Sequence, residues 1–175
     1  QLLFGNSDTT RGRRRKPVPQ SARLSVLLHS EWRARQLCEL ASMVDVTVSQ
    51  ETPDDNSWLV RMEGPALLPV AQEWTKGAVK TVPAQWRLSD RALQVWALVA
   101  GVLDESGMCF GLDAHIAQHE ELRKRAAEAL QKLGAASSYV GPRAGGPALR
   151  VVGQRRLANV MTIVGEPPED GSWDA

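Results

Sequence analysis

A repeat at a constant offset of 90 residues is the feature of this sequence that most restricts its fold. Residues 29–62 align on residues 119–152 without a gap. Six positions are identical: His29/His119, Glu31/Glu121, Arg33/Arg123, Arg35/Arg125, Leu40/Leu130 and Leu59/Leu149. Each copy is expected to have the same order of elements, namely strand, helix, strand, turn, strand and helix. The sequence therefore predicts two tandem α/β halves.

Apolar residues at helical spacing mark the main helix of each copy. In the second copy Gly134 ends a stripe made of Leu122, Ala126, Ala129, Leu130 and Leu133. In the first copy a helix is expected from an N-cap at Ser30 to about Met43. Further helices are expected over 65–76, 90–100 and 154–163.

Alternating apolar and polar residues predict a β-hairpin after each of these helices. The first hairpin is expected over 46–50 and 57–62, and the second over 137–140 and 148–152. Another short strand is expected before each helix, over 23–28 and 108–113.

Composition excludes several classes of protein. With 175 residues, 43% of them hydrophobic and 23% charged, the chain is typical of a globular protein. Two cysteines, Cys38 and Cys109, are too few for a disulfide framework or a cysteine-based zinc site. Charged residues, glycine or proline interrupt every apolar stretch before it reaches the length of a membrane span. Disulfide-rich secreted proteins, zinc fingers and membrane-spanning proteins are therefore not expected.

The charge is unevenly distributed along the chain. The net charge of +1 divides into −4 on residues 166–175 and therefore +5 on residues 1–165. Five positive charges lie within six residues: Arg11, Arg13, Arg14, Arg15 and Lys16. A basic body favours a polyanionic partner such as a nucleic acid.

Four segments together resemble a known family. They are residues 2–7 (LLFGNS), 23–31 (RLSVLLHSE), 74–83 (WTKGAVKTVP) and 88–96 (LSDRALQVW). In this order and at this spacing they resemble the LAGLIDADG homing endonucleases and their maturase relatives, particularly the single-chain type of organellar introns. The resemblance extends over nearly all of residues 2–164.

The resemblance implies a fold and a division of the chain. The fold is α/β (α+β), with two pseudo-symmetric LAGLIDADG-like αββαββα halves whose antiparallel sheets form a saddle. The first half is expected over 1–84, the second over 85–164, and an acidic tail over 165–175. Residues 2–7 would then be the end of the first motif helix.

The resemblance also indicates where catalysis would occur. Members of the family cleave phosphodiesters with one carboxylate per half, which holds a divalent metal ion at the end of the motif helix. The first position falls on Asn6. The second falls on Ala100 or on Ser106, depending on the register, and we prefer Ala100 because a strand over 108–113 can then follow a turn at 102–107. None of these side chains is an acid, so no nuclease activity, metal or cofactor is expected.

Other acids and histidines are interpreted as structural. Asp8, Asp104 and Glu105 lie beside the motif ends and would hold a metal only in a shifted register, so we interpret them as turn residues. His115 and His119 have the spacing of helical zinc ligands, but no further ligand completes the set.

The strands also predict a binding face. If Leu59 and Leu149 belong to the core, alternation places Trp58 and Arg150 on the other face, and the partner strands add Thr47, Ser49, Ser137 and Tyr139. Arg61 breaks this pattern because it shares the parity of Leu59. Nucleic-acid contacts are expected at eleven residues: Arg11, Arg13, Arg14, Arg15, Lys16, Thr47, Ser49, Trp58, Tyr139, Arg143 and Arg150. Trp58 could instead be covered by the loop at 11–16 or by another protein.

The other tryptophans divide into three groups. Trp32 and Trp96 fit apolar helix stripes and are expected in the core, whereas Trp74 and Trp86 flank the connector between the halves. Trp173 lies in the acidic tail, where a single large aromatic side chain suggests docking onto a partner protein.

Together these patterns predict a non-catalytic, endonuclease-derived scaffold that binds structured RNA in an organellar ribonucleoprotein. The RNA would be ribosomal or intron RNA, the location a mitochondrion or chloroplast, and the role that of a ribosome component or a splicing factor. Other proteins of the particle are expected partners, while neither a membrane nor a homodimer is required. One alternative is an active or partner-activated DNA endonuclease, and another is a protein–protein scaffold without nucleic-acid contact.

Overall fold

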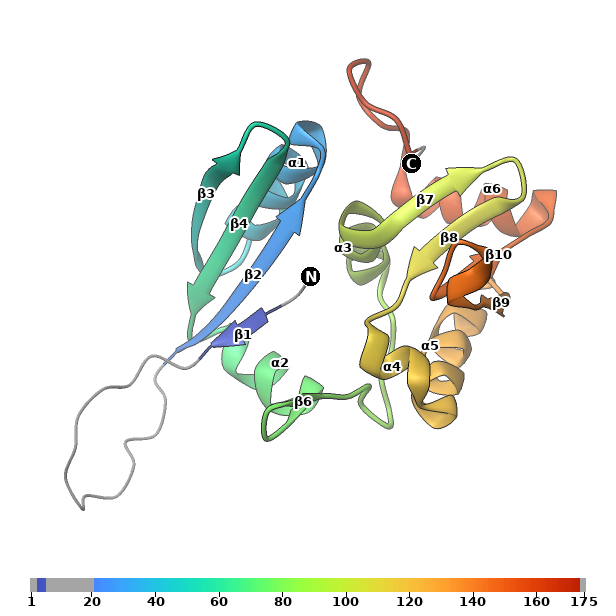
Figure 1. Cartoon of the computed structure of the whole chain (residues 1–175), viewed down its shortest axis with the longest axis horizontal. Helices are drawn as coiled ribbons and strands as arrows, with labels where there is room; N and C mark the ends of the chain where they lie inside the picture. Colours follow the sequence, from blue (N-terminus) through green and yellow to red (C-terminus); the bar gives the residue numbers. More distant parts are fainter. Residues whose placement is uncertain (1–2, 6–20, 174–175) are drawn as a thin grey trace. The chain divides into compact units, whose positions relative to one another are not determined.

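The structure is a computed structural model that describes residues 3–5 and 21–173 (Figure 1). Its contacts divide the chain into two compact units, residues 1–73 and 74–175. Unit 1 contains β1 (Leu3–Gly5), β2 (Ala22–Leu28), α1 (Glu31–Ser42), β3 (Thr47–Asp54), β4 (Ser57–Gly64) and most of α2 (Leu67–Trp74). Unit 2 contains β5 (Thr75–Lys76), β6 (Val79–Lys80), α3 (Asp90–Ala100), β7 (Gly101–Asp104), β8 (Gly107–Gly111), α4 (Ala114–Gln118), α5 (Glu120–Lys132), β9 (Ser137–Val140), η1 (Pro142–Ala144), β10 (Ala148–Val151) and α6 (Gln154–Val164).

The two units have the same sheet topology. Both sheets are antiparallel and four-stranded, with the orders β1-β2-β4-β3 and β7-β8-β10-β9. The mixed α/β class with antiparallel sheets is thus confirmed, and the repeated strand order agrees with the internal repeat of the sequence. None of the described helices is long and apolar enough to cross a bilayer.

The structural repeat has an offset of 89 residues, so the ungapped alignment at 90 is wrong by one. Ser30 and His119 are the N-caps of α1 and α5, and Val60 and Leu149 occupy equivalent buried positions. Trp32 and Leu122 are therefore not equivalent. The offset of 89 also gives six identities: Glu31/Glu120, Glu39/Glu128, Ser49/Ser138, Pro53/Pro142, Arg61/Arg150 and Gly64/Gly153.

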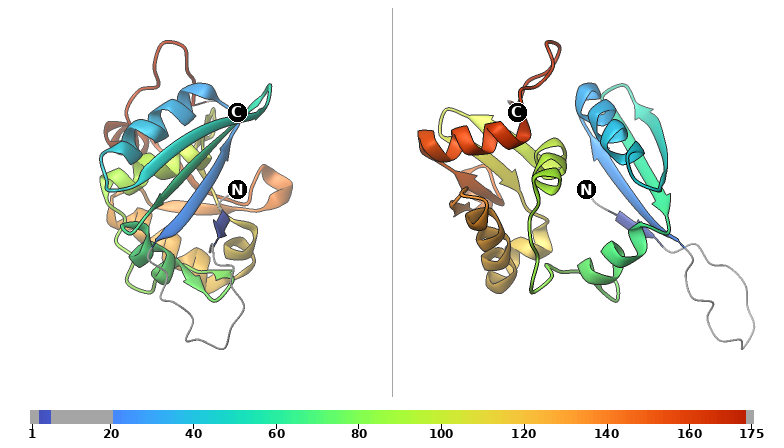
Figure 2. Two further views of the ribbon diagram at one scale, coloured as in Figure 1. Left: turned by 90° about the vertical axis from the view of Figure 1, so that its left-hand side faces the viewer. Right: turned by 180° about the vertical axis from the view of Figure 1, so that it is seen from behind.

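The core of unit 1 lies between α1 and one face of its sheet (Figure 2). Val26 and Val60 are cross-strand partners and are almost completely buried, as is Leu37 of α1. Cross-strand partners share a face, so one side of β2 and β4 is apolar and covered by the helix. In unit 2 the equivalent face of β8 and β10 is buried with the apolar sides of α3, α5 and α6: Met108, Phe110, Leu149 and Val151 with Leu93, Ala97, Leu130 and Val160.

The expectation of a helix at the start of the chain is wrong. Residues 3–5 form β1, which pairs with β2 as β7 pairs with β8. In unit 2 the corresponding helix, α3, ends directly before β7. The apolar letters of residues 2–7 match a helix end and an edge strand equally well, and only the pairing with β2 decides between them.

The connector between the repeats belongs to unit 2, so the contacts divide the chain eleven residues before the boundary expected after residue 84. Lys80 Nζ lies 2.6 Å from Asp113 Oδ2, and the Arg125 guanidinium donates to the Val82 carbonyl at 3.0 Å. Trp86 packs edge-on against Trp74 and also contacts Trp96. These contacts join the connector to α4, α5 and α3.

Asp113 gives a prediction about pH. Burial opposes its ionisation, but the hydrogen bonds from Lys80 and from the His115 N–H outweigh burial and hold the pKa of Asp113 below its ordinary value. Asp113→Ala should cost about 1 kcal/mol at pH 7, mostly from the lost N-cap of α4, because a solvent-screened ion pair adds little. Because the pKa of Asp113 is lower in the folded state than its unfolded-state value of about 4, the ionised carboxylate stabilises the fold above about pH 4. This stabilisation is lost as the pH falls through the lower pKa of the folded state.

Urea denaturation of wild type and Asp113→Ala between pH 7 and pH 2.5 measures this effect. The difference in unfolding free energy should persist down to about pH 4 and then shrink. A difference that grows on acidification would contradict the assignment.

The described part of the acidic tail packs on unit 2. Trp173 is only 4% exposed, its indole N–H donates to the Gly165 carbonyl at 3.2 Å, and its own carbonyl accepts from Leu103 N–H at 2.9 Å. Trp173 is thus covered by its own chain, contrary to the expectation that nothing buries it, and docking of the tail onto a partner protein stays a prediction. The local sequence of the tail does not indicate burial, because the covering residues come from β7 and the end of α6.

Candidate nucleic-acid interface

The sheet of unit 1 has an open face, which we define as the face opposite α1. Cross-strand register assigns to it Arg23, Ser25, Leu27, Thr47, Ser49, Glu51, Leu59, Arg61 and Glu63. Thr47 and Ser49 thus lie where the sequence predicts them. A small pocket on this face is lined by Arg23, Thr47, Ser49, Arg61 and Glu63.

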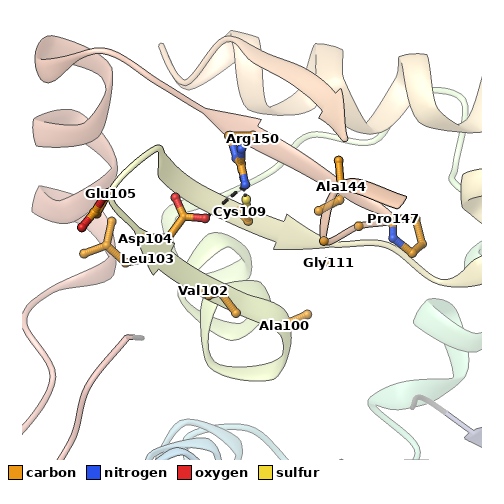
Figure 3. Close-up of a pocket in the computed structure, with 13 residues that line it drawn as sticks. Ala100, Val102, Leu103, Asp104, Glu105, Cys109, Gly111, Ala144, Pro147 and Arg150 are labelled. Atoms are coloured by element: carbon orange, nitrogen blue, oxygen red, sulfur yellow. Dashed lines mark hydrogen bonds and ion pairs between the residues drawn. The ribbon is translucent and has the colours of Figure 1, made fainter. Parts of the chain in front are cut away.

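The sheet of unit 2 has an equivalent open face. It carries Val102, Asp104, Cys109, Ser138, Val140, Ala148 and Arg150. Arg150, expected on this face, occupies the position that Arg61 has in unit 1. Its side chain points towards Asp104 and Cys109 (Figure 3). Arg150 Nη2 donates to Asp104 Oδ2 at 3.1 Å, and Nε donates to Cys109 Sγ at 3.1 Å.

A hollow beside Arg150 extends across this open face. It is bounded by the end of α3, by β7 and β8, and by the loop that follows η1. Its lining includes Ala100, Asp104, Cys109, Gly145, Pro147 and Arg150 (Figure 3). Arg143 lies in η1 beside this loop and is exposed. The hollow places one cation and two acids, Asp104 and Glu105, at a surface that is otherwise largely apolar.

Every arginine on the described open faces has a carboxylate partner. Arg23 Nη2 lies 2.8 Å from Glu63 Oε2, and Arg61 Nη1 hydrogen-bonds to Glu51 Oε1. The bond from Arg23 is also the main reason that the pKa of Glu63 is lowered. With the Arg150–Asp104 pair, each described open face presents its arginines already neutralised. A polyanion that binds there must compete with these acids.

Three residues expected on the binding face lie on the opposite face. Trp58 shares its side of β4 with Val60 and Met62, which face α1, so Leu59 and Arg61 are on the open face instead. Tyr139 pairs with the buried Leu149, and the Arg123 guanidinium of α5 lies 4.6 Å from the centre of its ring. Ser137, which pairs with Val151, is on the same helix-covered side.

These corrections have one physical cause. Both parities of β4 carry apolar residues, so alternation alone does not identify the buried side. The identity of Leu59 and Leu149 in the alignment at 90 suggested that both are core residues, but the helices bury Val60 and Leu149.

Ala100 occupies the end of α3, as the preferred register predicts. Gly101 follows it at once, where an added Cβ would lie only 2.5 Å from the Ala97 carbonyl oxygen. Ser106 lies in the turn between β7 and β8 and donates its N–H to Asp104 Oδ1. The expected turn at 102–107 is shorter than predicted, because residues 101–104 form β7.

The candidate metal ligands do not converge in the part of the chain that the structure describes. No group of three or more His, Cys, Asp or Glu side chains is placed there to hold a metal ion. His115 and His119 stack with ring centroids 4.2 Å apart. Asn6, Asp8 and the basic residues expected to bind RNA, Arg11, Arg13, Arg14, Arg15 and Lys16, lie outside the described residues.

Sequence reasoning missed Arg23, Arg61 and their acidic partners, as well as Cys109. The alignment at 89 contained a usable signal, because it pairs Arg61 with Arg150 and Ser49 with Ser138. Both pairs prove to share the open face. Cys109 offered no such signal, since its role depends on the side chain of Arg150 reaching it across the sheet.

No protein-family model matches the sequence, and no curated protein matches it. Among solved structures, the chain is similar to mesophilic variants of the homing endonuclease I-DmoI. The sequence identity is 14% and the TM-score 0.49, over 93% of this chain and 87% of that chain. A likeness of this size does not extend to activity or ligands, and the fold class rests on the strand order of the chain itself.

Proposed function

We propose that this chain is a non-catalytic scaffold of LAGLIDADG-like descent that binds structured RNA in an organellar ribonucleoprotein. The observation that carries the proposal is the open sheet face of each unit, with an arginine at the same register in both, Arg61 and Arg150. Arginine suits the backbone of a nucleic acid because its planar donors match the phosphate oxygens. Two such faces offer extended backbone contact with little need for base readout.

The non-catalytic part of the proposal rests on Ala100. In a LAGLIDADG-like enzyme, the end of α3 would carry the metal-binding carboxylate, and the methyl group of Ala100 cannot coordinate a divalent cation. Loss of this ligand would leave the binding surface in place while removing the chemistry. A ribosome component and an intron-splicing factor are both consistent with such a role, in a mitochondrion or a chloroplast.

A protein–protein scaffold without nucleic acid is the second candidate. One observation favours it: the arginines of the described open faces are already paired with Glu51, Glu63 and Asp104. A neutral, partly apolar face is a better match for a protein than for a polyanion. The two candidates differ in whether binding depends on salt concentration.

Salt titration distinguishes these functions. Replacing Arg13, Arg14 and Arg15 with alanine should weaken binding to an RNA duplex at ~150 mM salt and flatten the salt slope by roughly one to three units, because each phosphate contact contributes to that slope. The matched control is the triple alanine variant of Arg91, Arg155 and Arg156, which has the same change in charge on exposed helix positions. Its slope should remain close to that of the wild type.

RNA should also be preferred to DNA of the same sequence, because a protein can contact the 2′-hydroxyl groups. Equal slopes for both triple variants, or no RNA binding, would favour the protein scaffold. Magnesium- or manganese-dependent nicking of a DNA duplex by the wild type would instead establish an endonuclease.

A further inference from the structure

The ion pairs of the open faces share a pattern that the repeat alone does not require. Each arginine is held by a carboxylate on the same face of its sheet but from a different strand. The pairs are Arg23 of β2 with Glu63 of β4, Arg61 of β4 with Glu51 of β3, and Arg150 of β10 with Asp104 of β7. Arg61 and Arg150 occupy equivalent positions, but their acids come from opposite edges of the two sheets. Glu51 lies on the last strand of its sheet, β3, and Asp104 on the first strand of its sheet, β7. The pairing is therefore preserved although the source of the acid differs.

We propose that Arg61 and Arg150 are latent phosphate-binding sites, and that Glu51 and Asp104 are built-in competitors for the RNA backbone. This inference rests on the proposed function. A carboxylate and a phosphate present similar oxygen pairs to a guanidinium, so an RNA phosphate can take the place of the acid. The acid also repels an approaching phosphate until the exchange has occurred.

The exposure of these pairs makes the exchange physically reasonable. The side chains of Arg61 and Glu51 are 38% and 53% exposed, and those of Arg150 and Asp104 are 24% and 43% exposed. Solvent-exposed ion pairs contribute little stability and are weakened by salt, so one phosphate can displace one acid at small cost. Isolated phosphates gain little from the exchange, whereas a backbone that reaches several arginines gains from each. The acids therefore favour binding of a structured RNA backbone over binding of isolated phosphate groups.

The two carboxylate oxygens of Asp104 have different partners, so a substitution can remove one contact and keep the other. Asp104 Oδ1 accepts the Ser106 N–H at 2.7 Å within the β7–β8 turn, while its Oδ2 accepts from Arg150. Asp104→Asn keeps a carbonyl oxygen for the turn but replaces the oxygen that accepts from Arg150 with an NH2 group, which donates and cannot accept. The turn is preserved, and Arg150 loses its carboxylate partner while keeping the hydrogen bond to Cys109 Sγ. Glu51→Gln removes the negative charge beside Arg61.

The test measures binding of a fluorescently labelled RNA hairpin to the full chain over a range of salt concentrations. Asp104→Asn and Glu51→Gln should each tighten binding roughly two- to fivefold at ~150 mM salt, the equilibrium equivalent of breaking one exposed ion pair. Each salt slope should steepen by about one unit, because no displaced carboxylate then takes up a cation when the phosphate binds its arginine. The control is Glu128→Gln, an equal change in charge at an exposed position on α5. Glu128→Gln should change the RNA affinity and the salt slope only by the small effect of removing one distant, salt-screened negative charge.

A double variant completes a double-mutant cycle for Asp104 and Arg150. If Asp104 acts by occupying Arg150, adding Arg150→Ala should abolish the gain from Asp104→Asn. Circular dichroism establishes that each variant is folded, and the Glu51→Gln/Arg61→Ala pair repeats the test in unit 1. If the wild type binds RNA but Asp104→Asn and Glu51→Gln bind it no more tightly than Glu128→Gln does, the latent sites are overturned and the proposed function stands. No binding by any variant overturns both.

Discussion

Phe110→Ala should lower the free energy of unfolding of unit 2 by about 3–5 kcal/mol, the usual cost of truncating a fully buried phenylalanine. The side chain is 0% exposed, pairs across the sheet with Leu149, and has its ring centroid 5.3 Å from that of Trp96. The truncation leaves a cavity between the sheet and α3, which the surrounding side chains fill only in part. Because a domain of this size is stable by about 5–15 kcal/mol, the loss is a large part of the total.

Urea denaturation followed by circular dichroism measures this loss. Tyr139→Ala is the matched aromatic control on the same face of the same sheet, since Tyr139 is 41% exposed and contacts Arg123 at the surface. Its cost should stay below about 1 kcal/mol. Equal losses for the two variants would contradict the burial of Phe110 in the core of unit 2.

Trp173→Ala should lower the free energy of unfolding of unit 2 by about 3 kcal/mol, at the lower end of the range for large buried aromatics. The indole is nearly completely buried and donates its N–H to the Gly165 carbonyl. The same residue closes the edge of β7 through the Leu103 N–H, so the loss of its side chain should also increase exchange of the Leu103 amide hydrogen.

Denaturation and amide hydrogen exchange of the isolated protein measure both effects. Glu169→Ala, an exposed position in the same tail, should change stability by less than about 0.5 kcal/mol. If Trp173 instead served to dock a partner protein, Trp173→Ala would leave the isolated protein unchanged and weaken only the complex.

Elements with strong local signals were predicted well from the sequence. The helix expected over 90–100 is α3 and the strand expected over 137–140 is β9. Ser89 explains the sharp start of α3, because its hydroxyl accepts the Ala92 N–H at 3.2 Å. Ser30 occupies the N-cap position of α1 as expected, although its side chain makes no capping hydrogen bond. Capping and helical periodicity act within a few residues and are therefore visible in the sequence alone.

The candidate interface was only partly predictable. Thr47, Ser49 and Arg150 lie on the open faces as expected, whereas Trp58 and Tyr139 do not. Alternation states that neighbouring residues point to opposite faces, but not which face a helix covers. The ion pairs of Arg61 and Arg150 join different strands and depend on strand order and register, which no local pattern contains.

The internal repeat and the residues of most helices and hairpins follow from the sequence alone. The sequence did not determine the register of the repeat, because the offsets of 89 and 90 each give six identities. Tertiary packing made that choice. In β4, Leu59 competes with Val60 for the buried side, and only one parity can face α1. Burying Val60 with its neighbours Trp58 and Met62 removes more apolar surface from water than burying Leu59 with Arg61 and Glu63, so the hydrophobic effect places the two charged residues on the open face.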